Sequence, residues 1–298
     1  MNSNDQPDYI VRINGRQVDP SKATISIFDH GFLFGDSIYE VIRTIGDRPF
    51  AWAAHLARLR SSAKRLSYDL PWTDEEITSE LRSVIDSKTW PGESYVRIII
   101  TRGPGLIDLH PRSCGPPTMI FIGKQIPVTP EELYANGMVL CVTDVRRNSR
   151  LAMDPAIKSG NYLNNVLAAI EAAEKGTDDA VMLNENDHVT ECTTSNIFIV
   201  FNGVVKTPSL DSGILAGITR NQVLHVAELE GIPAQEALLT LDDLKSADEI
   251  FITGTVRMIM PVRKIIGKID WEAGPGPITR RLMDAFVQAL GAEDISSR

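Results

Sequence analysis

Two residues of this sequence have the types and surroundings that covalent chemistry on a carbonyl compound requires. Lys158 follows Ala156 and Ile157 and precedes small residues and a tyrosine. An amine held against apolar surface loses hydration, so its pKa falls and its neutral form can attack a carbonyl carbon. A lysine that extends from the end of a strand into solvent would look the same. Glu191, which opens the run of residues 191–198, favours the chemical interpretation.

A lysine and a carboxylate are both required by pyridoxal phosphate (PLP), the cofactor for which a Schiff-base lysine is most useful. Its ring accepts electrons best when the pyridine nitrogen stays protonated, and a carboxylate favours that form. Its phosphate needs N–H groups at a helix start and a guanidinium. Residues 213–220 lead into a predicted helix where the amides of Ile218 and Thr219 would face an anion. Arg58 and the hydroxyl-rich end of residues 251–255 are further candidates, with a surface arginine and an ordinary helix cap as the alternatives.

The elements that position these residues form a mixed α/β chain in two halves. The first half has a predicted hairpin over 9–18, helices over 54–67 and 73–87, and strands over 95–101 and 118–122. The second has predicted strands over 138–143, 179–183 and 197–201, and helices over 162–175, 219–230 and 278–290. Two prolines between the halves indicate a linker. We therefore predict an N-terminal domain over 1–122, a linker over 123–134 and a C-terminal PLP-binding domain over 135–298; no GxGxxG opens a helix, so a Rossmann domain is not expected.

Composition excludes several classes of partner. The net charge of -9 over 298 residues argues against nucleic acid and anionic membranes, which need clustered lysines and arginines. No stretch approaches the roughly 20 apolar residues that span a bilayer, and the polar N-terminus lacks a signal-peptide core. Cys114, Cys141 and Cys192 are too few and too dispersed for a disulfide framework or a zinc site. We expect a cytoplasmic protein without a metal.

Several motifs together resemble the class IV (fold-type IV) PLP-dependent aminotransferases. This group holds branched-chain aminotransferases, D-amino-acid and R-amine transaminases, and aminodeoxychorismate lyases. The most specific stretch is Glu191-x-Thr193-x-x-Asn196-Ile197-Phe198, continued by Leu215-x-Gly217-Ile218-x-Arg220; residues 28–31, 55–63, 158–162 and 254–255 also fit. The resemblance covers nearly the whole chain. It implies the fold of D-amino-acid aminotransferases, with a smaller N-terminal and a larger C-terminal α/β domain and cofactor between them. It also implies a homodimer or higher homo-oligomer in which each subunit lends part of a neighbour's substrate pocket.

The resemblance also implies roles for single residues. Lys158 would bond covalently to PLP and then move the proton between the substrate α-carbon and the cofactor. Glu191 would pair with the pyridine nitrogen, and Tyr162 would donate a hydrogen bond to the phenolic oxygen. The expected phosphate ligands are Arg58, Ile218, Thr219 and Thr255.

The substrate motifs point in two directions. Tyr95-x-Arg97 and Arg43 match the branched-chain enzymes, whereas Tyr39-Glu40-Val41 looks like the D-amino-acid transaminases. The latter carry a carboxylate-binding arginine two residues before a histidine, but here Asp108 precedes His110. Arg257 is either a new carboxylate contact or a solvated surface charge, of which we favour the second. The expected substrate-binding set is Phe34, Tyr39, Val41, Arg43, Tyr95, Arg97 and His110.

The predicted function is therefore a branched-chain-type transaminase. It would pass an amino group from an amino acid, expected to be a branched-chain L-amino acid, to an α-keto acid such as 2-oxoglutarate by a ping-pong mechanism. Alternatives within enzymes are a D-amino-acid or R-amine transaminase and an aminodeoxychorismate lyase. Outside catalysis, the alternative is a PLP-binding relative that has lost turnover.

Overall fold

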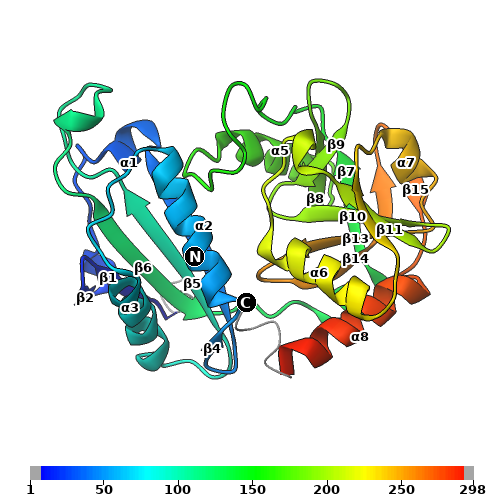
Figure 1. The fold of residues 1–298 in the computed structure, drawn as a ribbon, viewed down its shortest axis with the longest axis horizontal. Helices are drawn as coiled ribbons and strands as arrows, with labels where there is room; N and C mark the ends of the chain where they lie inside the picture. Colours follow the sequence, from blue (N-terminus) through cyan, green and yellow to red (C-terminus); the bar gives the residue numbers. More distant parts are fainter. Residues whose placement is uncertain (1–7, 292–298) are drawn as a thin grey trace. The chain divides into compact units, whose positions relative to one another are not determined.

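The computed structural model describes residues 8–291, and the chain divides into two compact units (Figure 1). One unit holds the described residues up to Pro127 together with Ile157–Asn161; the other holds Val128–Ala156 and the described chain from Tyr162 onward. The segment that carries Lys158 therefore packs with the first unit, although elements of the second unit precede it in the sequence. The predicted division into consecutive segments assigned residues 157–161 to the C-terminal domain, whereas they pack with the first unit.

The first unit is built on an antiparallel sheet of six strands in the described chain. Their order is β2 (Arg16–Val18), β1 (Ile10–Ile13), β6 (Thr118–Gln125), β5 (Ser94–Thr101), β3 (Ser37–Ile45) and β4 (Arg48–Pro49). The β1–β2 hairpin turns at Asn14 and Gly15, which both have positive φ, as the Asn-Gly pair predicts. β6 runs on to Gln125, so the first residues of the segment predicted as a linker are the end of a strand.

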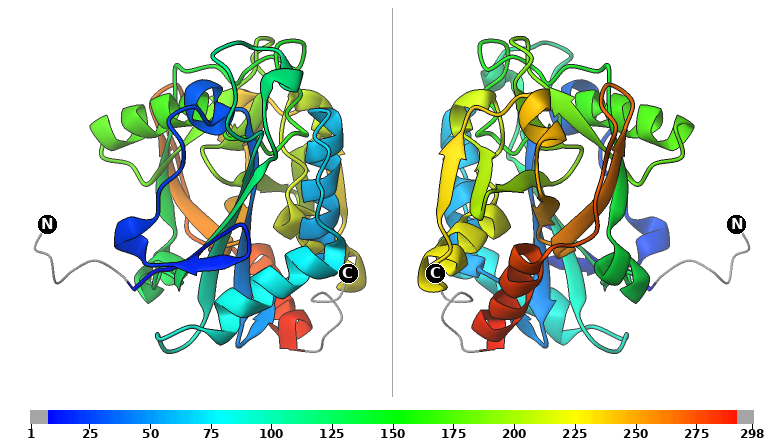
Figure 2. Two further views of the ribbon diagram at one scale, coloured as in Figure 1. Left: turned by 90° about the vertical axis from the view of Figure 1, so that its left-hand side faces the viewer. Right: turned by 90° about the vertical axis from the view of Figure 1, so that its right-hand side faces the viewer.

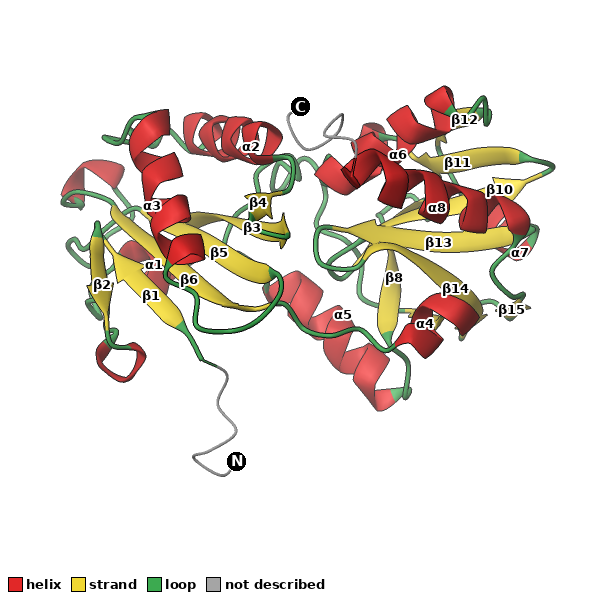
Figure 3. Ribbon diagram, turned by 90° about the horizontal axis from the view of Figure 1, so that it is seen from below, coloured by secondary structure: helices red, strands yellow, loops and turns green. Residues whose placement is uncertain are grey.

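Two helices cover one face of this sheet, α2 (Trp52–Arg65) and α3 (Asp74–Asp86) (Figure 3). A capping box starts α3: the Thr73 hydroxyl accepts the Glu76 N–H, and the Glu76 carboxylate accepts the Thr73 N–H. Between sheet and helices lies a closed apolar core. Burial alternates along β5, so Tyr95 and Arg97 lie on the opposite, half-exposed face.

The second unit is built on a longer sheet. Its order is β12 (Ala234–Ala237), β11 (Val204–Pro208), β10 (Asn196–Phe201), β13 (Glu249–Gly254), β14 (Met258–Ile266), β7 (Met138–Val142), β8 (Asp179–Leu183) and β9 (Val189–Cys192), with β15 (Trp271–Glu272) on β14. β9 pairs with β8 and also with β10, where Glu191 lies opposite Asn196. The strands from β10 round to β9 therefore close into a barrel.

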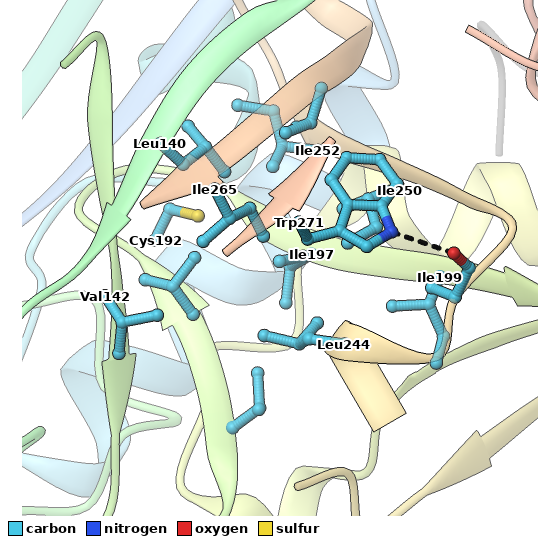
Figure 4. Packing of buried hydrophobic residues seen from close by; sticks show 14 of the residues in the cluster. Leu140, Val142, Cys192, Ile197, Ile199, Leu244, Ile250, Ile252, Ile265 and Trp271 are labelled. Carbon is cyan, nitrogen blue, oxygen red and sulfur yellow. Dashed lines mark hydrogen bonds between the residues drawn. The ribbon is translucent and has the colours of Figure 1, made fainter. Parts of the chain in front are cut away.

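Branched and aromatic side chains fill this barrel (Figure 4). The indole N–H of Trp271 donates to the carbonyl of Ala247 at 2.8 Å, which satisfies the one polar atom that this large side chain buries. The packed barrel gives a rigid frame to the residues at the ends of β9, β10 and β13.

The helices of the second unit are α4 (Glu131–Asn136), α5 (Leu163–Glu174), α6 (Ile218–Leu229), α7 (Leu241–Lys245) and α8 (Pro277–Gly291). α6 and α8 pack together against the sheet (Figures 2 and 3). The buried carboxylate of Glu249 accepts the N–H groups of Ile278 and Thr279, which fixes the start of α8. Within residues 8–291, none of the helices has the length and apolar character needed to cross a membrane.

Candidate active site

The backbone around Lys158 is fixed to the first unit on two sides. The N–H of Tyr39 donates to the Lys158 carbonyl at 2.9 Å, and the N–H of Gly160 donates to the Ser37 carbonyl at 2.7 Å, so the segment runs beside β3. On the other side, the Ser62 hydroxyl of α2 accepts the Lys158 N–H at 3.2 Å. A Cβ on Gly160 would lie 2.1 Å from Ser37 Oγ, so this close approach requires glycine. The amine is thus carried by a rigid segment.

The Lys158 amine and the Arg97 guanidinium contact the same aromatic ring. Nζ of Lys158 lies 4.5 Å from the centroid of the buried Tyr39 ring, and Cζ of Arg97 lies 4.1 Å from the same centroid. Two cations therefore contact one electron-rich ring. Three residues predicted for catalysis and substrate binding, Lys158, Tyr39 and Arg97, are brought together.

Three further predicted residues lie on the same sheet face as Arg97. Val41 is opposite Arg97 in the β3–β5 register, and Arg43 is opposite Tyr95. Arg43 is already paired, because its Nε donates to the carboxylate of Glu93 at 2.7 Å. A carboxylate of a substrate would have to compete with Glu93 for Arg43.

Arg58 belongs to a buried network that the sequence did not reveal. Its guanidinium donates twice to Glu40, at 2.7 and 2.8 Å, and Glu40 also accepts Nδ1–H of His55 at 2.8 Å. Burial alone would raise the pKa of Glu40, but the adjacent Arg58 charge and the hydrogen bonds from both partners hold that pKa well below its usual range. Burial lowers the pKa of the His55 ring, although the hydrogen bond to Glu40 acts in the opposite direction. The bidentate pair fixes the plane and position of Arg58.

Phe34 and His110 belong to other parts of the first unit. Phe34 ends the short helix α1 (His30–Phe34), and its ring meets that of His30 edge-on at 4.9 Å. His110 is exposed, and its Nδ1 accepts the Arg112 N–H. The structure thus places these two predicted substrate residues in α1 and in the loop after β5, rather than on the strands that carry Tyr39 and Arg97.

In the second unit, Glu191 of β9 is held by donors on both carboxylate oxygens. Oε1 lies 3.0 Å from Nη2 of Arg147. Oε2 accepts Nδ2–H of Asn196 and the N–H of Leu215, each at 3.2 Å. The Glu191 side chain is little exposed to solvent, and these donors stabilise and orient its carboxylate.

Arg147 could not be recognised from its place in the sequence. There it is one of two adjacent arginines, which is typical of a surface position. The fold instead places its Nη1 3.3 Å from Oδ1 of Asn165, whose Nδ2 donates to the Thr193 carbonyl at 2.7 Å. The partners come from α5 and β9, so no local pattern around Arg147 could have identified it.

The start of α6 forms a compact polar site. Gly217 is the N-cap residue, and Ile218 and Thr219 are the first helical residues, whose N–H groups have no acceptor within the helix. Thr219 is buried, and its hydroxyl has no hydrogen-bond partner in the described chain. A Cβ on Gly217 would lie 1.9 Å from Oδ1 of Asn196. Unpaired N–H groups beside an unpaired hydroxyl are the donors that an anion needs.

The remaining predicted residues lie at the ends of elements. Thr255 follows the last residue of β13 in the turn to β14, and Tyr162 is the N-cap residue of α5. Arg257, in the same turn as Thr255, is half-buried, with Nη1 3.8 Å from Sδ of the buried Met138. Arg257 is therefore not the fully solvated surface charge expected from the sequence, because one guanidinium nitrogen contacts a buried side chain.

Residues 37–265 match the family model for amino-transferase class IV. The chain belongs to the class IV aminotransferase family. It is 42% identical over 276 residues to a predicted branched-chain-amino-acid aminotransferase of Methanocaldococcus jannaschii, covering 93% of this chain and 94% of the relative. It is 35% identical over 288 residues to a D-alanine aminotransferase of Listeria monocytogenes, covering 94% and 96%. The branched-chain aminotransferase of the archaeon Thermoproteus uzoniensis, solved with norvaline, superposes with a TM-score of 0.88 at 30% identity, covering 96% of this chain and 95% of that one.

Class IV aminotransferases depend on PLP, and the residues of this chain fit that cofactor. The buried, unpaired hydroxyl of Thr219 and the free N–H groups at the start of α6 suit a phosphate. Glu191 presents a fixed carboxylate, which suits a protonated ring nitrogen. Lys158 carries the amine that would bond to PLP. The chain thus holds side chains of the types that PLP binding requires.

Proposed function

We propose that this class IV aminotransferase moves the amino group between a branched-chain L-amino acid and 2-oxoglutarate by a ping-pong mechanism. The observation that carries the proposal is the arrangement on β3 and β5, where Lys158 and Arg97 contact the same Tyr39 ring. A guanidinium beside the reactive amine suits a substrate that carries a carboxylate near its amino or keto carbon. The likeness to the predicted branched-chain enzyme of M. jannaschii supports the same substrate class.

In this proposal, the residues that the family resemblance implies hold the cofactor. Arg58, the N–H groups of Ile218 and Thr219, and the Thr255 hydroxyl bind the phosphate. When bound, PLP withdraws electrons from the α-carbon of the substrate. Glu191 keeps a proton on the ring nitrogen, and Tyr162 orients the ring through its phenolic oxygen.

Lys158 has two tasks in the proposed mechanism. Its Nζ would hold PLP covalently, and, once released, the same Nζ would take up and return the proton of the substrate α-carbon. The hydrogen bonds that fix the Lys158 backbone favour this second task, because proton transfer needs the amine held at one distance. Arg97 orients the substrate through its carboxylate.

A D-amino-acid transaminase is the second candidate, and two observations favour it. Val41 lies opposite Arg97 on the sheet, and the run Tyr39-Glu40-Val41 resembles that group. The D-alanine aminotransferase of L. monocytogenes is also a relative. Against this candidate, Asp108 occupies the position of the carboxylate-binding arginine, and its carboxylate accepts the N–H of His110 at 2.7 Å.

A substrate screen separates the two candidates. The purified protein, saturated with PLP, is given 2-oxoglutarate with L-leucine, L-isoleucine, L-valine, D-alanine or an R-amine, and glutamate formation is measured. We expect kcat/KM for L-leucine, L-isoleucine or L-valine to exceed that for D-alanine by at least about tenfold. Turnover with D-alanine alone would overturn the branched-chain assignment.

We also propose a homodimer that acts in the cytoplasm. Large apolar side chains are exposed on the first unit around α1 and the loop after β5: Ile25, Ile27, Phe28, Phe32, Leu106, Ile107 and Leu109. Such a group is more apolar than the surface of a monomer normally is, and a second copy is the partner that the family resemblance implies. Sedimentation of the purified protein as a monomer would contradict this. The three free cysteines are consistent with a reducing compartment.

A further inference from the structure

Lys124 is a cation on the sheet face of the first unit that also carries Tyr39 and Arg97, and no role has been given to it. It lies near the end of β6, directly opposite Tyr95 of β5. Its Nζ lies 5.3 Å from the centroid of the Tyr95 ring, and the side chain is half-buried. Lys124 falls in the segment predicted as a linker, but as part of a strand it has a fixed position on the sheet.

Lys124 and Arg97 are close neighbours on this face. Arg97 pairs with Ile122, so Lys124 is its diagonal neighbour on β6, at a Cα separation of about 7–8 Å. Both side chains lie on the sheet face opposite the one on which α2 and α3 pack. Like charges so placed repel one another unless an anion lies near them.

No carboxylate of residues 8–291 neutralises these two cations. Arg97 contacts the Tyr39 ring, and Lys124 contacts the Tyr95 ring; neither makes an ion pair within the described chain. Arg43, on the same face, is neutralised by Glu93 at 2.7 Å. Two half-buried cations of this kind form a receptor for an anion that arrives from outside the chain.

We propose that Lys124, beside Arg97, receives the second carboxylate of a dicarboxylic substrate, and so determines specificity for that class. The inference rests on the proposed function, because it assigns the anion to the five-carbon keto acid and its amino acid. A substrate with a branched apolar side chain has no charge to offer Lys124. The flexible stem of Lys124 can then turn its ammonium toward solvent and leave its methylene groups along the pocket.

The test compares a dicarboxylic with an apolar acceptor in the PLP-loaded enzyme. Lys124→Met removes the charge at similar volume, and Lys124→Arg keeps the charge. With L-valine as the common donor, we expect Lys124→Met to lower kcat/KM for 2-oxoglutarate about tenfold, the value of one charge-assisted hydrogen bond, and to change kcat/KM for 4-methyl-2-oxopentanoate less than twofold. Lys124→Arg should recover most of the loss.

Lys206 provides a matched control. It is also half-buried on a strand, β11, and its Nζ lies 5.4 Å from the centroid of the Phe201 ring. Lys206→Met should leave kcat/KM for both acceptors within twofold of the value for the unchanged protein. If Lys124→Met lowers kcat/KM equally for both acceptors, or lowers it for neither, the inference is overturned.

A binding measurement separates failure of the inference from failure of the proposed function. Calorimetry gives the Kd of two unreactive acids, glutarate and 4-methylpentanoate, on the PLP-loaded protein. We expect Lys124→Met to raise only the Kd of glutarate, by about tenfold. If the protein turns over no branched-chain donor, the proposed function fails, while an unchanged Kd for glutarate would refute the role of Lys124 by itself.

Discussion

Replacing Gly217 by alanine is a sharp test of how the α6 site is built. The new Cβ would lie 1.9 Å from Oδ1 of Asn196, an overlap that requires Asn196 to move. Asn196 is 5% exposed, and its Nδ2 donates to Glu191 at 3.2 Å and to the Leu215 carbonyl at 3.0 Å. Rotation of this buried side chain away from the new Cβ would strain or break these hydrogen bonds.

The magnitude follows from these contacts. Overpacking in a closed site costs about 1–3 kcal/mol, and loss of a hydrogen bond to a charged group costs a similar amount. We expect Gly217→Ala to lower the free energy of unfolding of the cofactor-free protein by about 3 kcal/mol, or the melting temperature by roughly 5 °C. Because Glu191 and the start of α6 both shift, the affinity for PLP should fall by at least about tenfold.

Urea denaturation measures the stability, and absorbance titration with PLP measures the affinity. Gly274→Ala is the control, because a Cβ there meets no atom within 4 Å and φ is not positive; its stability should change by less than about 0.5 kcal/mol. Asn196→Ala removes the clashing atom, so adding Gly217→Ala to that variant should cost little more. If Gly217→Ala alone matches the unchanged protein in both assays, the close contact described here does not shape the site.

Three further predictions concern other contacts. Arg147→Met leaves Glu191 without its charged partner, so urea denaturation should show a loss of about 3 kcal/mol, whereas an unchanged midpoint would mean that the pair is not stabilising. Gly160→Ala forces its Cβ toward Ser37, so kcat should fall at least about tenfold, and Ser37→Gly in the same chain should restore part of it. Burial would raise the pKa of Glu171, but its lysine partner one turn along α5 holds it at about 2, below the ordinary value of 4.5. Its stabilisation is present above pH 4.5 and lost toward pH 2, so the stability difference from Glu171→Gln should shrink over that range.

Much of the fold could be predicted from local patterns. The helices over 73–87 and 219–230 were found to within a residue or two, because an N-cap and an apolar stripe specify such elements locally. β3 was not predicted. It alternates apolar residues with Tyr39 and Arg43, but Glu40 on its buried side breaks the pattern. Glu40 is tolerated there because Arg58 neutralises its charge and Arg58 and His55 both donate hydrogen bonds to it.

Site residues within a recognisable motif could be predicted from the sequence. Residues whose role depends on a partner distant in the sequence could not. Lys158, Glu191 and the start of α6 were identified from residue type, spacing and family resemblance. Arg147 and Lys124 were not, because their meaning depends on residues far away in the sequence. The exchange of Ile157–Asn161 into the first unit has the same origin, since its hydrogen bonds to β3 and α2 join residues that are distant in the sequence.

The most direct test of the central claim is chemical trapping of the cofactor on the protein. The PLP-loaded enzyme is reduced with borohydride, digested, and its peptides are mapped by mass spectrometry. Reduction fixes the bond between PLP and the amine that holds it, so we predict one phosphopyridoxyl group per chain, on Lys158, and loss of the visible absorbance band. The label on any of the other lysines, or full transaminase activity in Lys158→Ala, would contradict the account.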